Sequence, residues 1–469
     1  MRFIGREQEL ALLERLYQSD QFEFLVLYGR RRVGKTELLK QFVKKHGGVF
    51  FSAKEKNDTL NLSDFSNMLQ DYYEGMPYGT FSDWETLFSY IASKCKNEKQ
   101  IVIIDEFPFL AEENPSIKSV LQHCIDHLLS TKKILLILCG SSISFMEKEI
   151  MGYDSPLYGR STSQLELKEF NYFESAQFFP EFSLEEKMIT YGILGGIPCY
   201  LNQFSSQKSI EENIANEILR TGAFLKEEPQ SLLRMELREP AIYNSILEAI
   251  AEGATRLNEI ATKIHEDTSK CSKYISTLLN LRLIKRQVPC GEKSNYKKGI
   301  YAISDNFFLF WYKFVYSNQG YYELMGEDKA AEDIMQEENI HRYMGKIFEK
   351  ICLEYIIIQA KAGKLPFVPA IYGKWWGNNP VRKCEDDIDI LCQSKDKKSA
   401  ILCECKYTKK EFEQSEYEAF MSRAKIIKEC ENYYYYIFSK AGFTDGVKRQ
   451  AKMQGNVQLF TISDLFIGI

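Results

Sequence analysis

Residues 22–36 read FEFLVLYGRRRVGKT, in which a continuous apolar run leads directly into the pattern GxxxxGK[ST] at positions 29–36. The next residues, ELLKQFVKK, have the apolar spacing of an amphipathic helix. A buried strand, a glycine-rich turn and a helix in this order form the context that a phosphate-binding loop requires. The stretch therefore predicts an α/β domain built around a nucleotide-phosphate site.

The residue types in this loop suit the binding of ATP and Mg²⁺. Gly29 and Gly34 let the main chain pass close to phosphate oxygens, and the amides of the loop and of the helix start supply positive potential. We expect Lys35 to contact the β- and γ-phosphates and Thr36 to bind Mg²⁺. The other loop residues expected to line the phosphates are Arg30, Arg31, Arg32 and Val33.

A second motif, IVIIDEF at 101–107, is an apolar strand that ends in two acidic residues. Open α/β sheets bind their ligands at the carboxyl ends of the strands, which is where Asp105 and Glu106 lie. We expect Asp105 to hold the Mg²⁺ and Glu106 to polarise the attacking water, which predicts ATP hydrolysis as well as binding. The alternative is a surface acidic pair that only closes the strand.

The chain up to residue 170 alternates β-rich apolar runs with amphipathic stretches. The runs span 22–29, 47–53, 101–107, 132–141 and 164–170. Such alternation predicts a parallel sheet with helices on both faces. We expect a P-loop NTPase core over 1–168 and a helical lid over 169–238, where the pattern becomes helical.

Three further residues are candidates for the nucleotide site, each with a plain structural alternative. Ser141, or its neighbour Ser142, ends the fourth strand and would either sense the γ-phosphate or cap the next helix. Arg160 precedes the fifth strand and would be either an arginine finger, for its own subunit or a neighbour's, or part of a salt bridge. Pro198 lies in GGIP, a tight turn against adenine or a simple helix break.

A family resemblance rests on several short motifs that occur in a fixed order. They are FIGREQEL (3–10), GRRRVGKT, IIDEF, LCGSS, LYGR and LGGIPCYL. This order resembles a family of prokaryotic ATPases that is similar to the AAA-related and signal-transducing ATPases with many domains. The likeness covers about residues 1–230 and continues, less specifically, to the end. It implies that Arg6 lies near the nucleotide base and that Pro198 belongs to an adenine-contacting sensor.

A compact helical module is predicted over 239–303. Three amphipathic helices followed by a β-hairpin form a winged helix-turn-helix. Residues 270–300 hold eight basic residues and one acid, so we expect a surface for DNA phosphates although the whole chain carries −5. The residues assigned to DNA binding are Lys270, Lys273, Lys285 and Arg286. The alternative is a winged helix that serves only protein–protein contacts.

The segment EDDIDILCQSKDKKSAILCECKY (385–407) predicts two strands joined by a polar turn. If the turn is centred after position 396, paired positions sum to 793. Asp389 then faces Glu404. Asp387 faces Lys406 on the same side, because side chains alternate with a period of two. The opposite, apolar face would consist of Ile388, Ile390, Cys403 and Cys405.

Three carboxylates and a lysine on one face suit metal-dependent cleavage of phosphodiesters. We expect Asp389 and Glu404 to bind Mg²⁺ or Mn²⁺ through hard oxygen ligands, with Glu349 of the preceding helix completing the ligand set. A metal there would lower the pKa of bound water. Lys406 would orient that water or neutralise charge on the phosphate.

The arrangement resembles the PD-(D/E)XK nuclease superfamily, with Asp389 as its aspartate and Glu404-Cys405-Lys406 as its ExK. The ATPase family described above commonly ends in such a domain, here expected over 331–469. The pattern departs from the superfamily because Asp389 follows isoleucine instead of proline. Two alternatives stay open: a degenerate nuclease fold that only binds, and a simple ion pair between Asp387 and Lys406.

Length and composition exclude several classes of protein. The 469 residues, 45% hydrophobic and 27% charged, are typical of a multidomain globular chain and not of a disordered or collagen-like one. No apolar run approaches the roughly 20 residues that span a bilayer. The start of the chain lacks a signal-peptide pattern, so we expect a cytoplasmic protein without membrane contact. The aromatic stretch 304–330 is expected to be a linker.

The sequence thus favours an ATP-hydrolysing switch coupled to DNA, with two outcomes for the last domain. In one, it cleaves DNA with a second Mg²⁺ or an Mn²⁺, and the nucleotide state repositions the winged helix and the nuclease domain. In the other, the chain is a non-cleaving, nucleotide-gated regulator whose last domain binds DNA or a partner. Assembly with further copies or with a protein partner is open in both.

Overall fold

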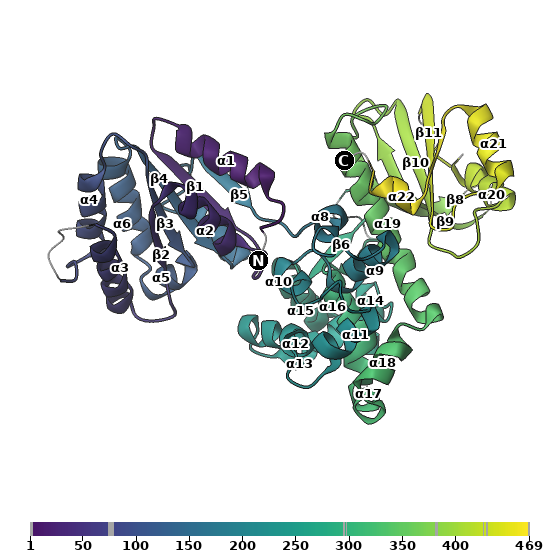
Figure 1. The fold of residues 1–469 in the computed structure, drawn as a ribbon, viewed down its shortest axis with the longest axis horizontal. Coiled ribbons are helices and arrows are strands. Elements are labelled where there is room, and N and C mark those ends of the chain that lie inside the picture. The colour runs from purple at the N-terminus through teal and green to yellow at the C-terminus, as the bar shows by residue number, and fades with distance from the viewer. Residues whose placement is uncertain are drawn as a thin grey trace. The chain divides into compact units, whose positions relative to one another are not determined.

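We describe the chain from a computed structural model, which covers residues 3–73, 79–293, 296, 298–379, 383–424, 426–427 and 430–467 (Figure 1). The chain forms two compact units. The first contains Met1–Glu169 and Ile197–Cys199, and the second contains Phe170–Gly196 and Tyr200–Ile469. Within the described ranges, no helix combines the length and the apolar character that crossing a bilayer requires.

A five-stranded parallel sheet forms the centre of the first unit, as the alternation of strands and helices predicted. Its order is β2-β3-β4-β1-β5, and all neighbouring strands run parallel. The interior residues of the central strands are buried, because helices cover both faces of such a sheet. The strands are β1 (Glu23–Tyr28), β2 (Val49–Ser52), β3 (Gln100–Asp105), β4 (Ile134–Gly140) and β5 (Ser163–Glu166).

Two apolar layers fill the space between this sheet and its helices. Leu25 and Ile103 pack with α1 and α2 on one face. Phe24 and Val102, their neighbours along the strands, pack with α3 to α6 on the other. The helices are α1 (Glu7–Gln18), α2 (Lys35–His46), α3 (Asp58–Tyr72), α4 (Trp84–Lys94), α5 (Phe107–Glu113), α6 (Ile117–Cys124) and α7 (Ile143–Phe145), with π-helical turns at Ile125–Leu129 and Met146–Ile150.

Short helices with strong N-terminal caps open the second unit. Three of them, α8, α9 and α11, begin with a capping box, in which an Asn or Ser side chain and a Glu side chain bond each other's main-chain amides. These caps set where the helices start in a stretch that has a helical pattern throughout. The helices are α8 (Tyr172–Ala176), α9 (Leu184–Leu194), α10 (Pro198–Leu201), α11 (Ile210–Ile214) and α12 (Phe224–Glu236), with a π-helical turn at Ala215–Leu219.

The aromatic stretch 304–330, which we expected to be a linker, is helical, and its first part, 304–315, is mostly buried. Trp311 donates its indole N–H to the carbonyl oxygen of Lys226 at 3.2 Å, and the hydroxyl of Tyr312 donates to Oδ1 of Asn244 at 2.6 Å. Aromatic side chains bury large apolar areas, so the stretch packs among the other helices instead of bridging them. Its elements are α16 (Asn306–Phe310), a π-helical turn (Trp311–Val315), a 3₁₀ turn (Tyr316–Asn318), α17 (Gln319–Met325) and α18 (Glu327–Ile334).

Three helices and a small antiparallel sheet occupy the region predicted as a helical module. Cys271, Ile275 and Leu278 of the third helix are buried at helical spacing, which leaves Ser272 and Lys273 on its exposed face. The elements are α13 (Pro240–Ala251), α14 (Leu257–Lys263), α15 (Thr268–Asn280), β6 (Ile284–Gln287) and β7 (Ile300–Ile303).

The C-terminal part is a five-stranded mixed sheet of order β12-β11-β10-β9-β8. Strands β8, β9 and β10 are antiparallel, whereas β10, β11 and β12 are parallel. Tyr355 of α19 contacts the rings of Phe438 and Phe460 on one face, and α20 and α21 pack on the other. The elements are α19 (Glu337–Lys361), β8 (Ile371–Asn379), β9 (Cys384–Gln393), β10 (Ser399–Lys406), α20 (Gln414–Ala424), β11 (Asn432–Ser439), α21 (Asp445–Gln454), β12 (Val457–Phe460) and α22 (Ile462–Leu465).

Candidate functional site

The loop from Gly29 to Gly34 wraps tightly between β1 and the start of α2. Gly29, Arg32 and Gly34 have positive φ angles of 154°, 68° and 97°. A Cβ on Gly29 would lie 2.4 Å from the carbonyl oxygen of Leu167, so only glycine fits there without displacing the main chain. Helix α2 begins at Lys35, next to the loop. The amides at a helix start point at whatever the loop encloses, which favours an anion.

Lys35 is 5% exposed and lies inside the loop. Its ammonium donates to the carbonyl oxygens of Gly29 at 2.8 Å and Arg30 at 3.0 Å. Burial lowers the pKa of Lys35 below its ordinary value, while nearby Glu106 and Asp105 oppose that shift. A desolvated ammonium held by main-chain oxygens has a strong tendency to bind a phosphate.

Thr36 and Asp105 connect the two sequence motifs directly. The hydroxyl of Thr36 donates to Oδ2 of Asp105 at 2.9 Å. Asp105 is 2% exposed and stands at the carboxyl end of β3. A hydroxyl and a carboxylate side by side are the hard oxygen donors that Mg²⁺ prefers, so the pair fits the metal of a bound nucleotide.

Glu106 adopts a left-handed backbone conformation, with φ 51°, directly after β3. Its Oε2 accepts hydrogen bonds from the hydroxyl of Ser141 at 2.9 Å and from the amide of Ser141 at 3.3 Å. Ser142, not Ser141, precedes α7, and its side chain makes no capping bond there. The structure therefore brings Ser141 to Glu106, a contact that the sequence did not predict.

Arg6 and Pro198, which the family resemblance placed near the nucleotide, both lie against the loop. Cγ of Pro198 is 3.8 Å from the position that a Cβ would take on Gly34. Arg6 is buried in a left-handed conformation. Its guanidinium donates to the carbonyl oxygen of Val33 at 3.0 Å and to Glu9 at 3.2 Å.

Arg160, predicted as an arginine finger or as part of a salt bridge, pairs with an acid. Arg160 forms a bidentate ion pair with Asp126, with Nε and Nη2 at 2.9 Å and 2.8 Å from its oxygens. The hydrogen bond to Asp126 raises the pKa of Arg160 above its ordinary value. The salt bridge is thus the role that the structure displays for this residue. The three loop arginines, Arg30, Arg31 and Arg32, are half-buried.

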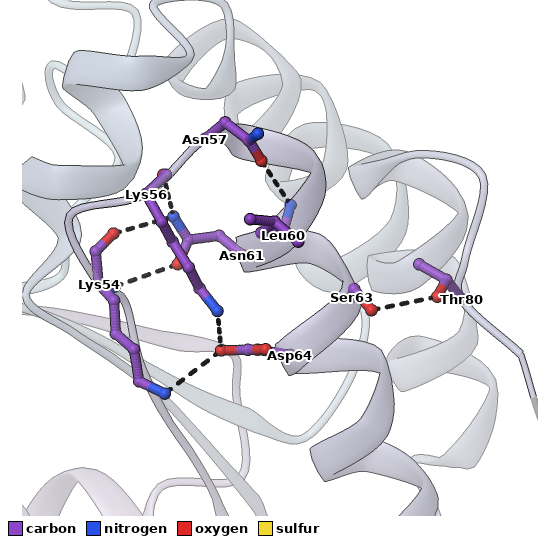
Figure 2. Close-up of polar contacts among 8 residues, drawn as sticks. All are labelled: Lys54, Lys56, Asn57, Leu60, Asn61, Ser63, Asp64 and Thr80. Carbon is purple, nitrogen blue, oxygen red and sulfur yellow. Dashed lines mark hydrogen bonds and ion pairs between the residues drawn. The ribbon is translucent and has the colours of Figure 1, made fainter.

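One buried asparagine holds the segment after β2 (Figure 2). Asn61 donates to the carbonyl oxygens of Lys54 at 3.0 Å and Lys56 at 2.9 Å, and accepts from the amide of Lys54 at 3.1 Å. Both lysines form ion pairs with Asp64. The residue before Lys54 donates its amide to the carbonyl oxygen of Asp105 at 2.9 Å. The network therefore fixes this segment beside the end of β3.

Three carboxylates surround the ammonium of Lys374 in the C-terminal sheet. Its Nζ lies 2.9 Å from Glu349 of α19, 3.0 Å from Asp387 and 3.6 Å from Asp389. Burial alone would lower the pKa of Lys374, but the carboxylates, Glu349 foremost, raise it above its ordinary value. Lys374 is therefore held as an ammonium among acids.

Two further cations neutralise Glu404, which is 4% exposed on β10. Lys406 lies 2.7 Å and Arg423 2.5 Å from its Oε1. Arg423 lies on α20, whereas Glu404 and Lys406 lie on β10, so a helix and a strand both contribute to this group of charges. Lys406, predicted to act at the phosphate, is thus found beside Glu404.

Asp389 stands between these two groups of charges. Its Oδ2 accepts the amide hydrogen of Cys405 at 2.8 Å. Burial, reinforced by Glu349 and Glu404, raises the pKa of Asp389 to about 7, although Lys374 opposes the shift. Crowded carboxylates of this kind are a donor set that suits a divalent cation.

The hairpin register matches the prediction, but a β-bulge comes after it. The pairs between β9 and β10 run from 393 with 400 to 390 with 403, and each sums to 793. The pairing of β8 with β9 then shifts by one residue at Lys374, opposite Asp389 and Ile390. The bulge reverses the alternation of side chains. Ile388 therefore packs with Leu391 against α20, and its predicted place on the opposite face is wrong.

The predicted pairing of Asp387 with Lys406 is also wrong. Asp387 contacts Lys374, and Lys406 contacts Glu404. The pairing of β9 with β10 ends at residues 390 and 403. Beyond that point Asp389 still accepts the amide hydrogen of Cys405, but Asp387 contacts β8 and Glu404 contacts α20.

No group of three His, Cys, Asp or Glu side chains is placed to hold a metal ion in the described part of the chain. At the C-terminal cluster, lysine and arginine nitrogens lie at ion-pair distance from the carboxylate oxygens. The assignment of a metal to Glu349, Asp389 and Glu404 therefore stays a prediction.

Two family models match the chain. One, described as an ATPase domain predominantly from Archaea, matches residues 3–204, which contain the loop and the Thr36–Asp105 pair. The other, described as archaea bacterial proteins of unknown function, matches residues 311–419, which contain α19 and the carboxylate cluster.

A relative of almost the same length decides the family. The uncharacterized protein MJECL04 of Methanocaldococcus jannaschii is 33% identical over 467 residues, which cover 98% of this chain and 99% of that protein. The chain belongs to its family. Together with the match to the ATPase domain, the loop geometry makes the protein a P-loop ATPase. The uncharacterized ATP-binding protein MJ0423 of the same organism is 48% identical over 42 residues, or 9% of this chain and 71% of that protein.

A solved structure supports the fold of the ATPase. The Walker-type ATPase PABY2304 of Pyrococcus abyssi is similar with a TM-score of 0.50 and 20% sequence identity. The likeness covers 66% of this chain and 95% of that one. At this identity the comparison concerns the fold alone, and it agrees with a P-loop core that begins the chain.

The basic residues predicted to contact DNA lie on α15 and β6 of the ATPase. Lys273, Lys285 and Arg286 are exposed. Lys270 forms an ion pair with a glutamate four residues earlier, at 2.9 Å. Lys297, part of the same basic stretch, lies outside the described residues.

The segment between β6 and β7 contacts the C-terminal sheet of the ATPase. The amide of Cys290 donates to the carbonyl oxygen of Lys374 at 2.8 Å, and its thiol to that of Leu391 at 3.3 Å. Lys298 lies 3.9 Å from Glu385. Part of the hairpin that the sequence assigned to DNA contact therefore contacts the C-terminal sheet of the same chain.

Sequence reasoning missed Lys374 and Arg423. Nothing in the stretch KWWGNN (374–379) indicated that its lysine would meet three carboxylates. The register of β8 depends on the bulge, and Arg423 reaches Glu404 only through the packing of α20. Neither contact is accompanied by a hydrophobic periodicity or a motif that could be recognised in the sequence.

Proposed function

We propose that the ATPase hydrolyses ATP through Lys35, Thr36, Asp105 and Glu106, and couples its nucleotide state to DNA. In this proposal a winged helix over 239–303 binds DNA, and the C-terminal domain over 331–469 cleaves it with a metal ion. The observation that carries the ATP site is the hydrogen bond of Thr36 to Asp105, because it brings the two motifs of an ATPase into contact.

The loop would bind the phosphates and the metal of MgATP. Mg²⁺ would draw negative charge from the phosphate oxygens and fix their positions. Thr36 and Asp105 would hold it, as their adjacent oxygens allow. Lys35 would exchange its carbonyl partners for the β- and γ-phosphates, while the amides of 29–34 surround them. Arg6 and Pro198 would contribute to the base side of the site.

Glu106 would accept the proton of the attacking water. A carboxylate that acts on water needs a fixed direction, and the two hydrogen bonds from Ser141 provide one. Ser141 would therefore orient Glu106, in addition to any contact with the γ-phosphate. The bidentate pair with Asp126 accounts for the charge of Arg160, and we assign it a structural role.

The helical module supports DNA binding through its order of elements and its exposed basic face. Three helices followed by an antiparallel pair of strands is the order of a winged helix. Lys273 on α15 and Lys285 on β6 are exposed, as phosphate contacts require. Such contacts favour any DNA sequence and weaken as salt increases.

The C-terminal domain supports DNA cleavage through its topology and its acids. A helix, three antiparallel strands, a helix and a parallel strand come in this order, as in the superfamily that the sequence resembles. Glu349, Asp389 and Glu404 would hold Mg²⁺ or Mn²⁺, which would lower the pKa of a bound water. Lys406 would break its ion pair with Glu404 and would instead neutralise charge on the phosphate.

The ATP part is tested by phosphate release from wild type, Lys35→Ala and Glu106→Gln. Lys35→Ala should lose ATP binding, because it removes the ammonium from the loop. Glu106→Gln should keep binding and lose hydrolysis. Lys410→Ala, an exposed lysine in the other unit, serves as the control. Normal hydrolysis in Glu106→Gln would remove Glu106 from the mechanism.

The DNA part is tested by incubating plasmid, single-stranded and branched DNA with Mg²⁺ or Mn²⁺, with and without ATP. Asp389→Ala and Lys406→Ala should abolish cleavage, whereas Glu411→Gln, an exposed acid of the same domain, should not. Lys35→Ala then reports whether ATP controls the reaction. Cleavage that survives Asp389→Ala would belong to a contaminant or to another site.

A second candidate function is a non-cleaving, nucleotide-gated regulator. The observation in its favour is that Lys374, Lys406 and Arg423 already neutralise the acids of the cluster. Cys290 also ties the hairpin of the helical module to the sheet. DNA binding with intact ATP turnover and no cleavage of any substrate would establish this function instead.

A further inference from the structure

The three acids around Lys374 come from two elements that are distant in sequence. Glu349 belongs to α19, while Asp387 and Asp389 belong to β9. The Nζ of Lys374 is within 3.6 Å of all three. Glu349 and Asp389 are also two of the three proposed metal ligands, so a divalent cation at that site would compete with Lys374 for both.

The charges of the cluster explain why a cation is needed there. Glu349, Asp387, Asp389 and Glu404 are four acids. They are balanced within the cluster by three cations, Lys374, Lys406 and Arg423. Lys406 and Arg423 both contact Glu404, whereas Lys374 lies within 3.6 Å of the other three acids. Of these three acids Asp389 is the most buried, with its side chain 13% exposed, and a buried carboxylate without a cationic partner is costly.

The backbone around Lys374 fixes where its side chain can reach. Lys374 stands opposite the bulge formed by Asp389 and Ile390. On the other side, its carbonyl oxygen accepts the amide hydrogen of Cys290 from the helical module. The strand is therefore held from both sides, and a change in the position of the Cys290 segment would move the lysine.

A pocket lies next to Lys374 on the side of the helical module. It has a volume of about 460 Å³ and lies where α14 begins beside β8. Lys374 and Trp376 line it from the sheet, and Arg256 and Glu259 from the helical module. Glu259, whose Oε2 accepts the amide hydrogens of Thr255 at 2.9 Å and Arg256 at 3.0 Å, is the carboxylate that lines this pocket.

We infer that Lys374 is a built-in counter-ion that occupies the metal position of the C-terminal cluster and must leave before a divalent cation binds. This inference rests on the proposed metal site and adds how that site is regulated. Lys374 is accordingly a positioning residue and takes no part in the chemistry. It keeps the acids together while no metal is present, and it competes with the metal for them.

The experiment measures Mn²⁺ binding to the full chain by calorimetry and by electron paramagnetic resonance, without ATP or DNA. Wild type is compared with Lys374→Met, which keeps most of the volume and removes the charge, and with Lys374→Arg, which keeps the charge. Lys410→Met, an exposed lysine of the same domain, is the control. Each protein is also made with Asp389→Ala, which identifies binding at the cluster.

We expect Lys374→Met to bind Mn²⁺ about tenfold more tightly than wild type or more, because the competing charge is gone. Lys374→Arg and Lys410→Met should bind like wild type. Equal affinities of wild type and Lys374→Met, with binding that still depends on Asp389, would overturn the counter-ion and leave the metal site in place. Absence of Asp389-dependent binding in every variant would overturn the metal site itself.

Thermal unfolding gives a second measurement that does not depend on activity. Lys374→Met should melt below wild type in EDTA, since three acids then lack their cation. Added Mn²⁺ should restore its melting temperature and should change that of wild type much less. A Lys374→Met protein that is equally stable with and without Mn²⁺ would contradict the inference.

Discussion

The hydroxyl of Thr36 donates a hydrogen bond to Oδ2 of Asp105 over 2.9 Å, across 69 positions of the chain. Thr36 lies in the first turn of α2 and Asp105 ends β3, so the bond joins two different sequence motifs. The bond exists because parallel strands all end at one edge of the sheet. It joins the part of the loop that binds phosphate to the acid that would hold the metal.

Replacement of Thr36 by valine should reduce steady-state ATP hydrolysis by about 100-fold or more, because a methyl group cannot bind Mg²⁺ or pair with Asp105. Thr36→Ser keeps the hydroxyl and should stay within about threefold of wild type. Both are measured by phosphate release at saturating MgATP. Full activity of the valine variant would show that the metal is held elsewhere.

Glu106 and Ser141 should behave as a unit. Glu106→Gln should lower hydrolysis by about 100-fold, the usual contribution of a positioned base, with nucleotide binding retained. Ser141→Ala leaves the carboxylate but removes one of its two donors, so we expect a loss of about tenfold.

The pair is tested by phosphate release combined with binding of a fluorescent ATP analogue. The double variant should lose no more than Glu106→Gln alone, since Ser141 acts through Glu106. Additive losses would mean that Ser141 contacts the nucleotide independently.

Asn61→Ala should destabilise the first unit by about 2–4 kcal/mol, because it leaves main-chain groups of Lys54 and Lys56 without their partner. Urea unfolding followed by circular dichroism measures the change. Asn57→Ala, which removes only an exposed helix cap on Leu60, should cost about 1 kcal/mol and serves as the control. Equal losses of unfolding free energy in the two variants would mean that the Asn61 hydrogen bonds stabilise the fold no more than an exposed helix cap does.

Stability should depend on pH through Asp389 in the metal-free protein. Its pKa is raised from 3.8 to about 7 on folding, so the folded chain binds more protons between these values. The stability from this carboxyl is therefore complete below pH 3.8 and is lost as the pH rises through about 7. Asp389→Asn mimics the protonated form and should stabilise the protein at pH 8 by on the order of 2 kcal/mol.

The measurement is thermal or urea unfolding in EDTA at pH 5 and pH 8. At pH 5 the gain from Asp389→Asn should be smaller than at pH 8, because less of the stability that depends on this carboxyl has been lost at that pH. Glu411→Gln, an exposed acid, should show no such dependence. A gain that is the same at both pH values would show that the substitution acts through packing.

Local patterns were sufficient where chemistry depends on a fixed spacing along the chain. The loop at 29–36, the acidic pair after β3 and the parallel sheet are all visible as runs, spacings and alternation. The register of the hairpin between β9 and β10 was also predictable, because a short turn leaves few ways to pair two strands. In each case the contacts that decide the structure lie close together in sequence.

Patterns failed where a single residue changes the register of its strand. The bulge opposite Lys374 moved Ile388 to the other face, and a period-two argument has no way to include it. The aromatic stretch 304–330 resembled a linker because its composition does not reveal its packing partners. Trp311 and Tyr312 have partners more than 60 positions away.

By itself, the sequence determined that this protein is a P-loop ATPase with a helical module and an acidic hairpin behind it. It did so because glycine turns, buried strands and alternating side chains are properties of neighbouring residues. Only the tertiary structure decided that Ser141 holds Glu106 and that Lys374 lies among Glu349, Asp387 and Asp389. Those contacts depend on how separate strands and helices pack, and packing distances are not encoded in any single stretch of the chain.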